Sequence, residues 1–242
     1  MEAFFEKLYK GTLKDFFAFT AEALAHNKKQ FIVTANPEAF ILGAKDCDLE
    51  KLLLDKETVV IADGIGVIKG ADILGISVPE RIPGVELAEH LLSCGNKLQK
   101  NIYLLGAKKE VLEALCEKIK SQYKNLSIAG CCDGYVEDKD AVFEEIKKLS
   151  PDIILVALGM PFQEKLIYKH LNGFDKGIFV GVGGSFDVLS GCKKRAPQFF
   201  IKHNIEWLYR ILKEPKRIKR FYNNNIKFLF EVKKLKSQKS GK

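Results

Sequence analysis

Short apolar runs alternate with amphipathic stretches along most of the chain. The runs at 58–62 and 152–159 are rich in β-branched and aliphatic residues, which is typical of buried strands. The stretches that follow them, such as 65–74, carry apolar residues at helical spacing. Strands are therefore expected at 31–33, 58–62, 101–105, 126–131, 152–159 and 177–182. Helices are expected at 12–27, 48–56, 65–74, 85–94, 108–123 and 139–149, with two more that begin at Pro37 and Pro161.

This alternation, which runs from residue 31 to about residue 190, predicts the fold class. It favours an α/β protein with a doubly wound, mostly parallel, Rossmann-like sheet. The run 152–159 supports the parallel arrangement, because a strand that is apolar throughout has to be covered on both faces. The 242 residues, 47% of them hydrophobic, suffice for one sizeable core or for one core with an appendage.

The pattern changes after residue 191. We expect an α/β core at 1–191 and a basic helical appendage at 192–242, with helices at 204–213 and 216–236 on either side of Pro215. The appendage holds 16 Lys or Arg and three acidic residues, whereas the core holds 23 basic and 28 acidic residues. This asymmetry predicts an anionic partner: nucleic acid, a phospholipid surface or a polyphosphate.

Aromatic residues such as Trp207 and Phe221 lie between the basic residues of the appendage. Basic and aromatic residues together fit a helix on an anionic membrane surface, where each Lys or Arg contributes about 1 kcal/mol. They also fit single-stranded nucleic acid, whose bases stack on aromatic rings. A third interpretation is a pair of amphipathic helices packed on the core with solvated charges. Composition alone leaves all three open.

Targeting and redox signals favour a cytosolic protein. No apolar run approaches the ~20 residues that a membrane-spanning helix needs. The segment 1–7 lacks the basic start and apolar block of a signal peptide. The six cysteines are scattered, without the C-x-x-C spacing of a zinc site or the density of a disulfide framework.

The stretch 58–66 carries the first candidate for chemistry. It ends in Asp63, Gly64, Ile65 and Gly66, which places the Asp63 carboxylate at the carboxyl end of a strand. Open α/β sheets bind ligands at that edge, and the glycines allow a close backbone approach. The alternative is that Asp63 caps the helix that begins near Ile65.

Polar residues follow two further strands at their carboxyl ends. Because the carboxyl ends of parallel strands meet at one edge of the sheet, side chains there converge on a single crevice. We therefore expect these residues to form a pocket with Asp63. They are Thr34, Asn36, Gln163 and Glu164.

A glycine-rich turn at 181–185 follows the last expected strand. Exposed backbone amides at Gly183 and Gly184, together with the dipole of a following helix, suit a phosphate group. The turn does not match G-x-G-x-x-G, because Phe186 occupies the last position, and it lacks the Lys-Ser/Thr of the P-loop. It favours a diphosphate-containing substrate over NAD or ATP bound in those modes.

No metal site is predicted. Asp46-Cys47-Asp48 and Asp138-Lys139-Asp140 match the D-x-D motif that holds a metal and a nucleotide sugar in some enzymes. Both lie at expected helix starts, where Asp is a favoured N-cap, and capping is the interpretation that we prefer. The four histidines show no metal-ligand spacing.

Taken together and in order, these motifs resemble the WecG/TagA/CpsF family of glycosyltransferases over nearly the whole chain. The resemblance rests on TANPE (34–38), ADGIG (62–66), RIPG (81–84), LGMPFQE (158–164), GVGGSFD (181–187), RAP (195–197), IEWLYR (205–210) and EPKR (214–217).

The resemblance implies a GT-E-like Rossmann fold and an inverting, metal-independent transfer from a UDP-sugar to a lipid-linked sugar at the inner membrane face. The matching positions make Asp63 the catalytic base and place Thr34 beside it as a second catalytic residue. In the family the appendage docks on the membrane and supplies arginines to the active site. With the two glycines of the turn included, the expected substrate-binding residues are Asn36, Arg81, Gln163, Gly183, Gly184, Arg210, Arg217 and Arg220.

The resulting hypothesis is transfer of N-acetylmannosamine from UDP to undecaprenyl-diphosphate-linked N-acetylglucosamine, in the linkage unit of wall teichoic acid. No cofactor and no nucleic acid partner are expected. The protein would be cytoplasmic and peripheral on the inner face of the cell membrane. Off the membrane, the exposed apolar side chains of the appendage could pack between subunits of a homo-oligomer. One alternative is another UDP-sugar, such as glucose or N-acetylmannosaminuronic acid, for capsule or exopolysaccharide. An alternative from another class is an RNA-binding module.

Overall fold

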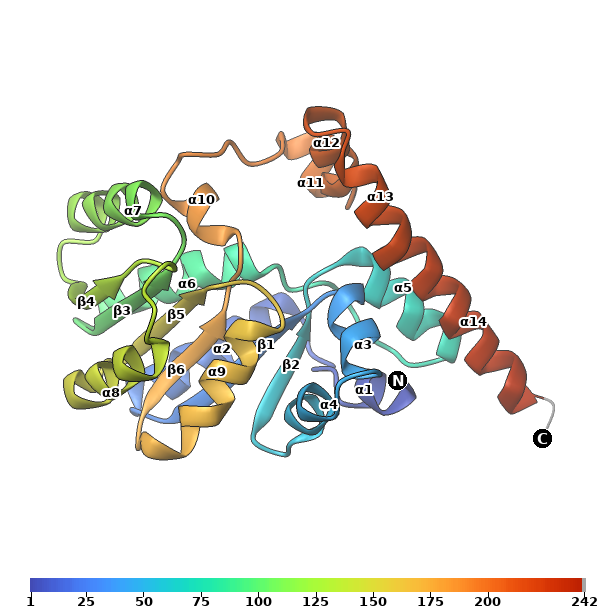
Figure 1. The fold of residues 1–242 in the computed structure, drawn as a ribbon, viewed down its shortest axis with the longest axis horizontal. Coiled ribbons are helices and arrows are strands. Elements are labelled where there is room, and N and C mark those ends of the chain that lie inside the picture. The colour runs from blue at the N-terminus through green and yellow to red at the C-terminus, as the bar shows by residue number, and fades with distance from the viewer. Residues whose placement is uncertain (241–242) are drawn as a thin grey trace.

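Six parallel strands form the centre of the computed structural model, which describes residues 1–240 except for the side chains of residues 217, 220, 239 and 240 (Figure 1). The strand order is β2-β1-β6-β5-β3-β4, and every neighbouring pair is parallel. The prediction of a doubly wound, Rossmann-like α/β sheet is therefore confirmed. The strands are β1 (Lys29–Ala35), β2 (Thr58–Ala62), β3 (Asn101–Gly106), β4 (Ser127–Cys132), β5 (Ile153–Ala157) and β6 (Gly177–Gly181).

Each face of the sheet carries its own hydrophobic cluster. Successive strand side chains point to opposite faces, so Phe31 and Val33 of β1 join one cluster and Ile32 joins the other. The cluster around Ile32 is covered by α2 (Leu13–Ala25), α6 (Gly84–Lys97), α7 (Lys109–Gln122) and α10 (Ser185–Leu189). The cluster around Phe31 is covered by α1 (Glu2–Glu6), α3 (Pro37–Gly43), α4 (Cys47–Leu54), α5 (Ile65–Leu74), α8 (Lys139–Leu149), α9 (Phe162–His170) and α14 (Lys227–Ser240).

The two D-x-D motifs cap helices, as predicted. Asp46 is the N-cap of α4, and its side chain accepts hydrogen bonds from the Asp48 and Leu49 amides. Asp138 is the N-cap of α8, and its side chain accepts from the Ala141 amide. These carboxylates satisfy the free N–H groups at helix starts, so both motifs have a structural explanation.

The appendage (192–242) contains α11 (Gln198–Lys202), α12 (Glu206–Lys213) and a long helix that begins with α13 (Arg217–Phe221). A π-helical turn, Tyr222–Ile226, joins α13 to α14. Figure 1 shows this red helix along one side of the molecule, next to α5, while α11 and α12 lie near the carboxyl ends of the strands. The expected helix at 216–236 is thus present, with a π turn that helical spacing does not reveal.

Helix α14 is attached to the core by aromatic packing. Phe228 is fully buried, and its ring lies 5.9 Å from the ring of Phe5 and 6.1 Å from that of Phe40. Gly70 of α5 leaves the space for this contact, since a Cβ there would come within 3.2 Å of Phe228. Val232, one turn further on, is also buried in this cluster. None of the helices in the described part of the chain is long and apolar enough to span a membrane.

We expect Phe228→Ala to lower the free energy of unfolding by about 3–5 kcal/mol, because it leaves a cavity between α14, α1 and α3. The matched control is Phe230→Ala on the same helix, whose side chain is 67% exposed and whose loss should change stability by no more than about 0.5 kcal/mol. Urea unfolding followed by circular dichroism measures both. Equal effects of the two substitutions would show that α14 does not pack on the core as described.

Candidate active site

Asp63 lies where β2 ends, at the carboxyl edge of the sheet. Its amide donates to the Ala35 carbonyl (2.9 Å), which fixes its backbone to the end of β1. Its side-chain Oδ1 accepts a hydrogen bond from the amide of Gly84, the first residue of α6 (2.6 Å). The alternative that Asp63 caps the next helix is wrong: the N-cap of α5 is Gly64, and no side chain caps it. The carboxylate instead bridges to α6.

The environment of Asp63 suits a proton acceptor. Burial raises the pKa of its carboxyl group, while the Gly84 amide and the positive charges of Arg210 and Arg81 act in the opposite direction. Among the described residues, no hydrogen bond engages Oδ2. One carboxylate oxygen is thus held by the backbone, and the other can face a ligand.

Thr34, at the end of β1, lies beside this pair. Its hydroxyl donates to the Gly181 carbonyl of β6 (2.9 Å), and its side chain is almost fully buried. A Cβ at Gly84 would come within 3.1 Å of the Thr34 methyl group, so the two residues are in contact. The structure therefore places Thr34 next to the amide that holds Asp63.

Asn36 is half-buried at the same edge and serves as the N-cap of α3, its Oδ1 accepting from the Ala39 amide (3.1 Å). Its other amide atom, Nδ2, is the atom that could bind a ligand.

Gln163 connects two turns of the edge. Its Oε1 accepts hydrogen bonds from the amides of Gly159 (3.0 Å) and Gly183 (3.2 Å), and its Nε2 donates to Glu164 (2.7 Å). Both side chains are buried against Gly181, where a Cβ would lie only 2.7 Å from each of them. Gln163 therefore fastens the turn after β5 to the glycine turn after β6.

Gly183 and Gly184 form the turn between β6 and α10. Gly183 has φ +48°, a left-handed conformation that favours glycine, and a Cβ at this position would meet no other atom within 4 Å. The turn thus has open space in front of it, as expected for a backbone that a ligand approaches.

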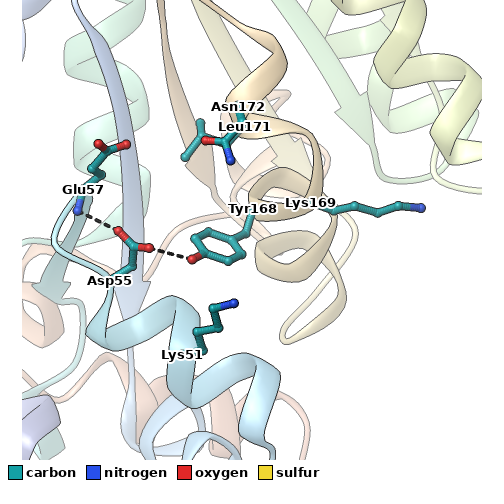
Figure 2. A pocket seen from close by; sticks show the side chains of 7 residues that line it. All are labelled: Lys51, Asp55, Glu57, Tyr168, Lys169, Leu171 and Asn172. Carbon is teal, nitrogen blue, oxygen red and sulfur yellow. Dashed lines mark hydrogen bonds between the residues drawn. The ribbon is translucent and has the colours of Figure 1, made fainter.

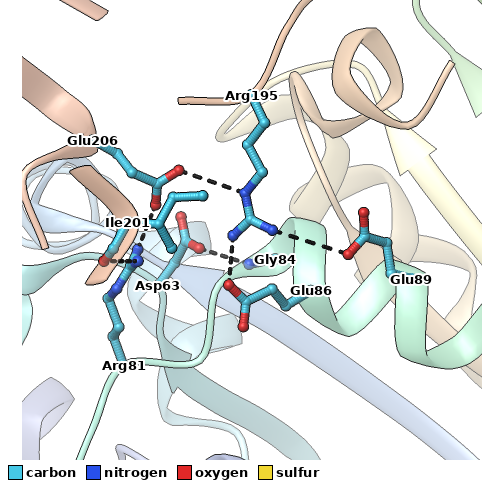
Figure 3. A network of polar contacts seen from close by, with 8 residues as sticks. All are labelled: Asp63, Arg81, Gly84, Glu86, Glu89, Arg195, Ile201 and Glu206. Carbon is cyan, nitrogen blue, oxygen red and sulfur yellow. Dashed lines mark hydrogen bonds and ion pairs between the residues drawn. The ribbon is translucent and has the colours of Figure 1, made fainter. Parts of the chain in front are cut away.

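An ion-pair network surrounds Asp63 (Figure 3). Arg81 donates from Nη1 to Glu206 of α12 (2.8 Å) and from Nη2 to the Ile201 carbonyl (3.5 Å). Arg195 pairs with Glu206 (3.7 Å) and with two acids of α6, Glu86 and Glu89. The site is therefore built by the core and the appendage together.

Arg210 of α12 is exposed and near enough to Asp63 for its charge to lower the pKa of that carboxyl. The prediction that the appendage brings an arginine to the acid therefore has a structural counterpart at this position. The other two arginines predicted from the appendage, Arg217 and Arg220, belong to α13, and their side chains lie outside the described residues.

Among the described residues, pockets lie at two opposite edges of the sheet. One, of about 260 Å³, is beside the network at the carboxyl edge, and five of its nine lining residues are apolar. They are Leu13, Ile65, Ile68, Pro79 and Pro83.

The other pocket, of about 290 Å³, is at the amino edge (Figure 2). There Asp55 accepts hydrogen bonds from Tyr168 (2.6 Å) and from the Glu57 amide (2.8 Å). These polar groups of the pocket are therefore hydrogen-bonded to each other. The carboxyl edge is the better candidate site, since parallel sheets bind ligands there.

Sequence reasoning did not assign roles to Glu206 and Arg195. Glu206 is one of only three acids in the strongly basic appendage, which is a signal that it has a cationic partner. Its partners could not be read from the sequence, because Arg81 is 125 positions away along the chain.

Comparison with known proteins agrees with this geometry. The sequence matches the glycosyl transferase WecG/TagA/CpsF family over residues 5–241. The chain belongs to this family. It is therefore a glycosyltransferase, as the motifs predicted, and the basic appendage no longer requires an RNA-binding explanation.

Relatives named N-acetylglucosaminyldiphosphoundecaprenol N-acetyl-beta-D-mannosaminyltransferase are similar over most of their length. The protein of Bacillus subtilis (strain 168) is 42% identical over 189 residues, which cover 78% of this chain and 73% of the relative. The protein of Staphylococcus aureus (strain MW2) is 40% identical over 207 residues, which cover 85% of this chain and 80% of the relative.

The buried Glu164 carboxyl generates a prediction about pH. Burial raises its pKa from 4.5 to about 7, so the folded state binds a proton more tightly than the unfolded state. Protonation of Glu164 therefore contributes to the unfolding free energy in full below pH 4.5, and this contribution is lost as the pH rises to about 7. The unfolding free energy of Glu164→Gln minus that of the wild type should therefore rise by roughly 2 kcal/mol as the pH increases from about 5 to about 8. Urea unfolding at several pH values measures this, and a difference independent of pH would contradict the raised pKa.

Proposed function

We propose that this glycosyltransferase moves N-acetylmannosamine from UDP-N-acetylmannosamine to undecaprenyl-diphosphate-linked N-acetylglucosamine, the linkage-unit step of wall teichoic acid synthesis. The acceptor and the transferred sugar are those in the names of its relatives. The observation that carries the proposal is the position of Asp63: it is at the carboxyl edge, its pKa is raised, and arginines from the core and the appendage lie nearby.

Asp63 acts as the general base. Its Oδ2 accepts the proton of an acceptor hydroxyl while that oxygen attacks the anomeric carbon from the face opposite UDP. The new glycosidic bond forms as the bond to the UDP oxygen breaks, which inverts the configuration. A raised pKa makes the carboxylate a stronger base, and the Gly84 hydrogen bond fixes its direction. Thr34 contributes by holding this part of the edge in place.

The departing UDP carries negative charge, which needs compensation. Arginine suits a diphosphate because its planar guanidinium group can donate two hydrogen bonds at once. We assign this role to Arg210 first, together with Arg217 and Arg220, and the backbone of Gly183 and Gly184 to the phosphate side of the pocket. Gln163 supports that backbone through Gly183, and Asn36 and Arg81 line the same edge. Because these groups compensate the charge, the transfer is proposed to need no metal ion.

The appendage is proposed to rest on the inner face of the membrane that holds the acceptor. It carries large hydrophobic side chains that are more than half exposed, together with exposed lysines, a combination typical of interfacial helices. The hydrophobic residues are Phe199, Leu212, Ile218, Tyr222 and Phe230. The lysines are Lys202, Lys213, Lys216 and Lys219.

Transfer assays with a short-chain lipid-diphosphate N-acetylglucosamine acceptor test the function. Purified protein should use UDP-N-acetylmannosamine in preference to UDP-glucose and UDP-N-acetylmannosaminuronic acid, and should retain full activity in EDTA. Preference for one of the other donors would assign the chain to capsule or exopolysaccharide synthesis instead.

Asp63→Asn should lower the rate of transfer at least about a hundredfold, the usual lower range for loss of a general base, while UDP binding measured by calorimetry stays near normal. In the wild type, activity should fall as the pH drops through the pKa of Asp63. Unchanged turnover by the variant would reject the role of this residue.

Leu212→Glu and Ile218→Glu should each reduce co-sedimentation with vesicles that contain phosphatidylglycerol, because a charge replaces an apolar contact with the interface. Leu98→Glu is the control: this side chain is 40% exposed but lies at the end of α6, outside the appendage. If both appendage variants sediment like wild type, the membrane surface has to be sought elsewhere on the protein.

A further inference from the structure

Glu206 is one of the residues through which the core and the appendage meet electrostatically. It is the first residue of α12, and its side chain is 12% exposed. The guanidinium groups of Arg81, at 2.8 Å, and of Arg195, at 3.7 Å, both face its carboxylate. Arg81 also donates to the Ile201 carbonyl of α11. Among the described residues, both hydrogen bonds of the Arg81 guanidinium group are therefore made to the appendage.

Arg195 extends this network to the helix that holds Asp63. It pairs with Glu86 and Glu89 of α6, whose first residue, Gly84, donates to Asp63. The Nε atom of Arg195 is buried and makes no hydrogen bond to the described residues, so Glu206 supplies the negative charge on that side. Figure 3 shows the three acids arranged around this guanidinium group.

Little else attaches α11 and α12 to the core. Among the described residues from 192 to 227, only Ala196 is buried, and none of the residues of α11 or α12 is. Hydrophobic burial therefore contributes little to the position of these two helices. Partly buried ion pairs, by contrast, are costly to break on one side, because the remaining charge loses its compensation.

We propose that Glu206 is a positioning residue whose pairing with Arg81 and Arg195 holds α11 and α12 over the carboxyl edge and so keeps Arg210 within electrostatic range of Asp63. Arg81 in turn acts by docking the appendage. The effect on catalysis rests on the function proposed above, whereas the docking itself does not.

Hydrogen–deuterium exchange of the substrate-free protein, followed by mass spectrometry, tests the docking. Glu206→Gln should speed exchange of the amides at 206–213 by about tenfold or more, while exchange in β1 and β6 stays unchanged and shows that the core is folded. The matched control is Glu110→Gln, which removes an exposed acid from the first turn of α7 and should change neither region.

A double-variant cycle identifies the partner. If Glu206 acts through Arg81, the variant with both Glu206→Gln and Arg81→Gln should lose little more protection than Glu206→Gln alone. Additive losses would show that the two side chains act separately and would overturn the pairing.

Activity then separates docking from direct contact with substrate. Glu206→Gln should lower kcat/KM for transfer in proportion to its loss of protection. A large loss of activity with unchanged exchange would overturn the proposal, because Glu206 would then act on the substrate itself. If the wild type rejects every UDP-sugar tested, the proposed function fails while the exchange experiment still decides the docking.

Discussion

The hydrogen bond from the Gly84 amide to Asp63 joins the end of β2 to the beginning of α6, and the arrangement of the site follows from it. Moving a carboxylate partly out of water costs free energy unless positive charge compensates it. The compensating groups come from two distant parts of the chain, Arg81 before α6 and Arg210 in α12. Chemistry at the edge and docking of the appendage are therefore coupled, because both depend on the groups that compensate the charge of this partly buried carboxylate.

Most of the fold could be predicted from the sequence because burial on both faces of a parallel sheet leaves a strong pattern. The run 152–159 shows it most clearly, and β5 lies within it. Two short α-helices escaped prediction. Helix α1, with Phe4 and Phe5 buried, and α11 each have five residues, too few for helical spacing to be recognised. The π turn before α14 also leaves no periodic signal.

The site was predictable up to the ends of the strands and no further. Asp63 directly follows β2, Thr34 is the next-to-last residue of β1, and Gln163 lies in the first turn of α9, just after β5. The rule that parallel strands end at one edge therefore brings them together. Contacts made across the chain fall outside that rule. The sequence indicates an acid in a basic appendage at Glu206, but only folding shows that Arg81 and Arg195 are its partners. The same holds for the hydrogen bond from the Gly84 amide to Asp63, since the sequence left open the alternative that this carboxylate caps α5.

Burial of Phe228 and Val232 gives the appendage a second anchor point. The chain leaves the core after α10 and returns to it at α14, so α11 and α12 form a strap tethered at both ends rather than a free tail. Lifting such a strap leaves its ends in place, and the entropic cost of closing it again grows only with the logarithm of its length. A site covered in this way can admit a bulky molecule and be covered again at a local concentration that a separate subunit would not reach.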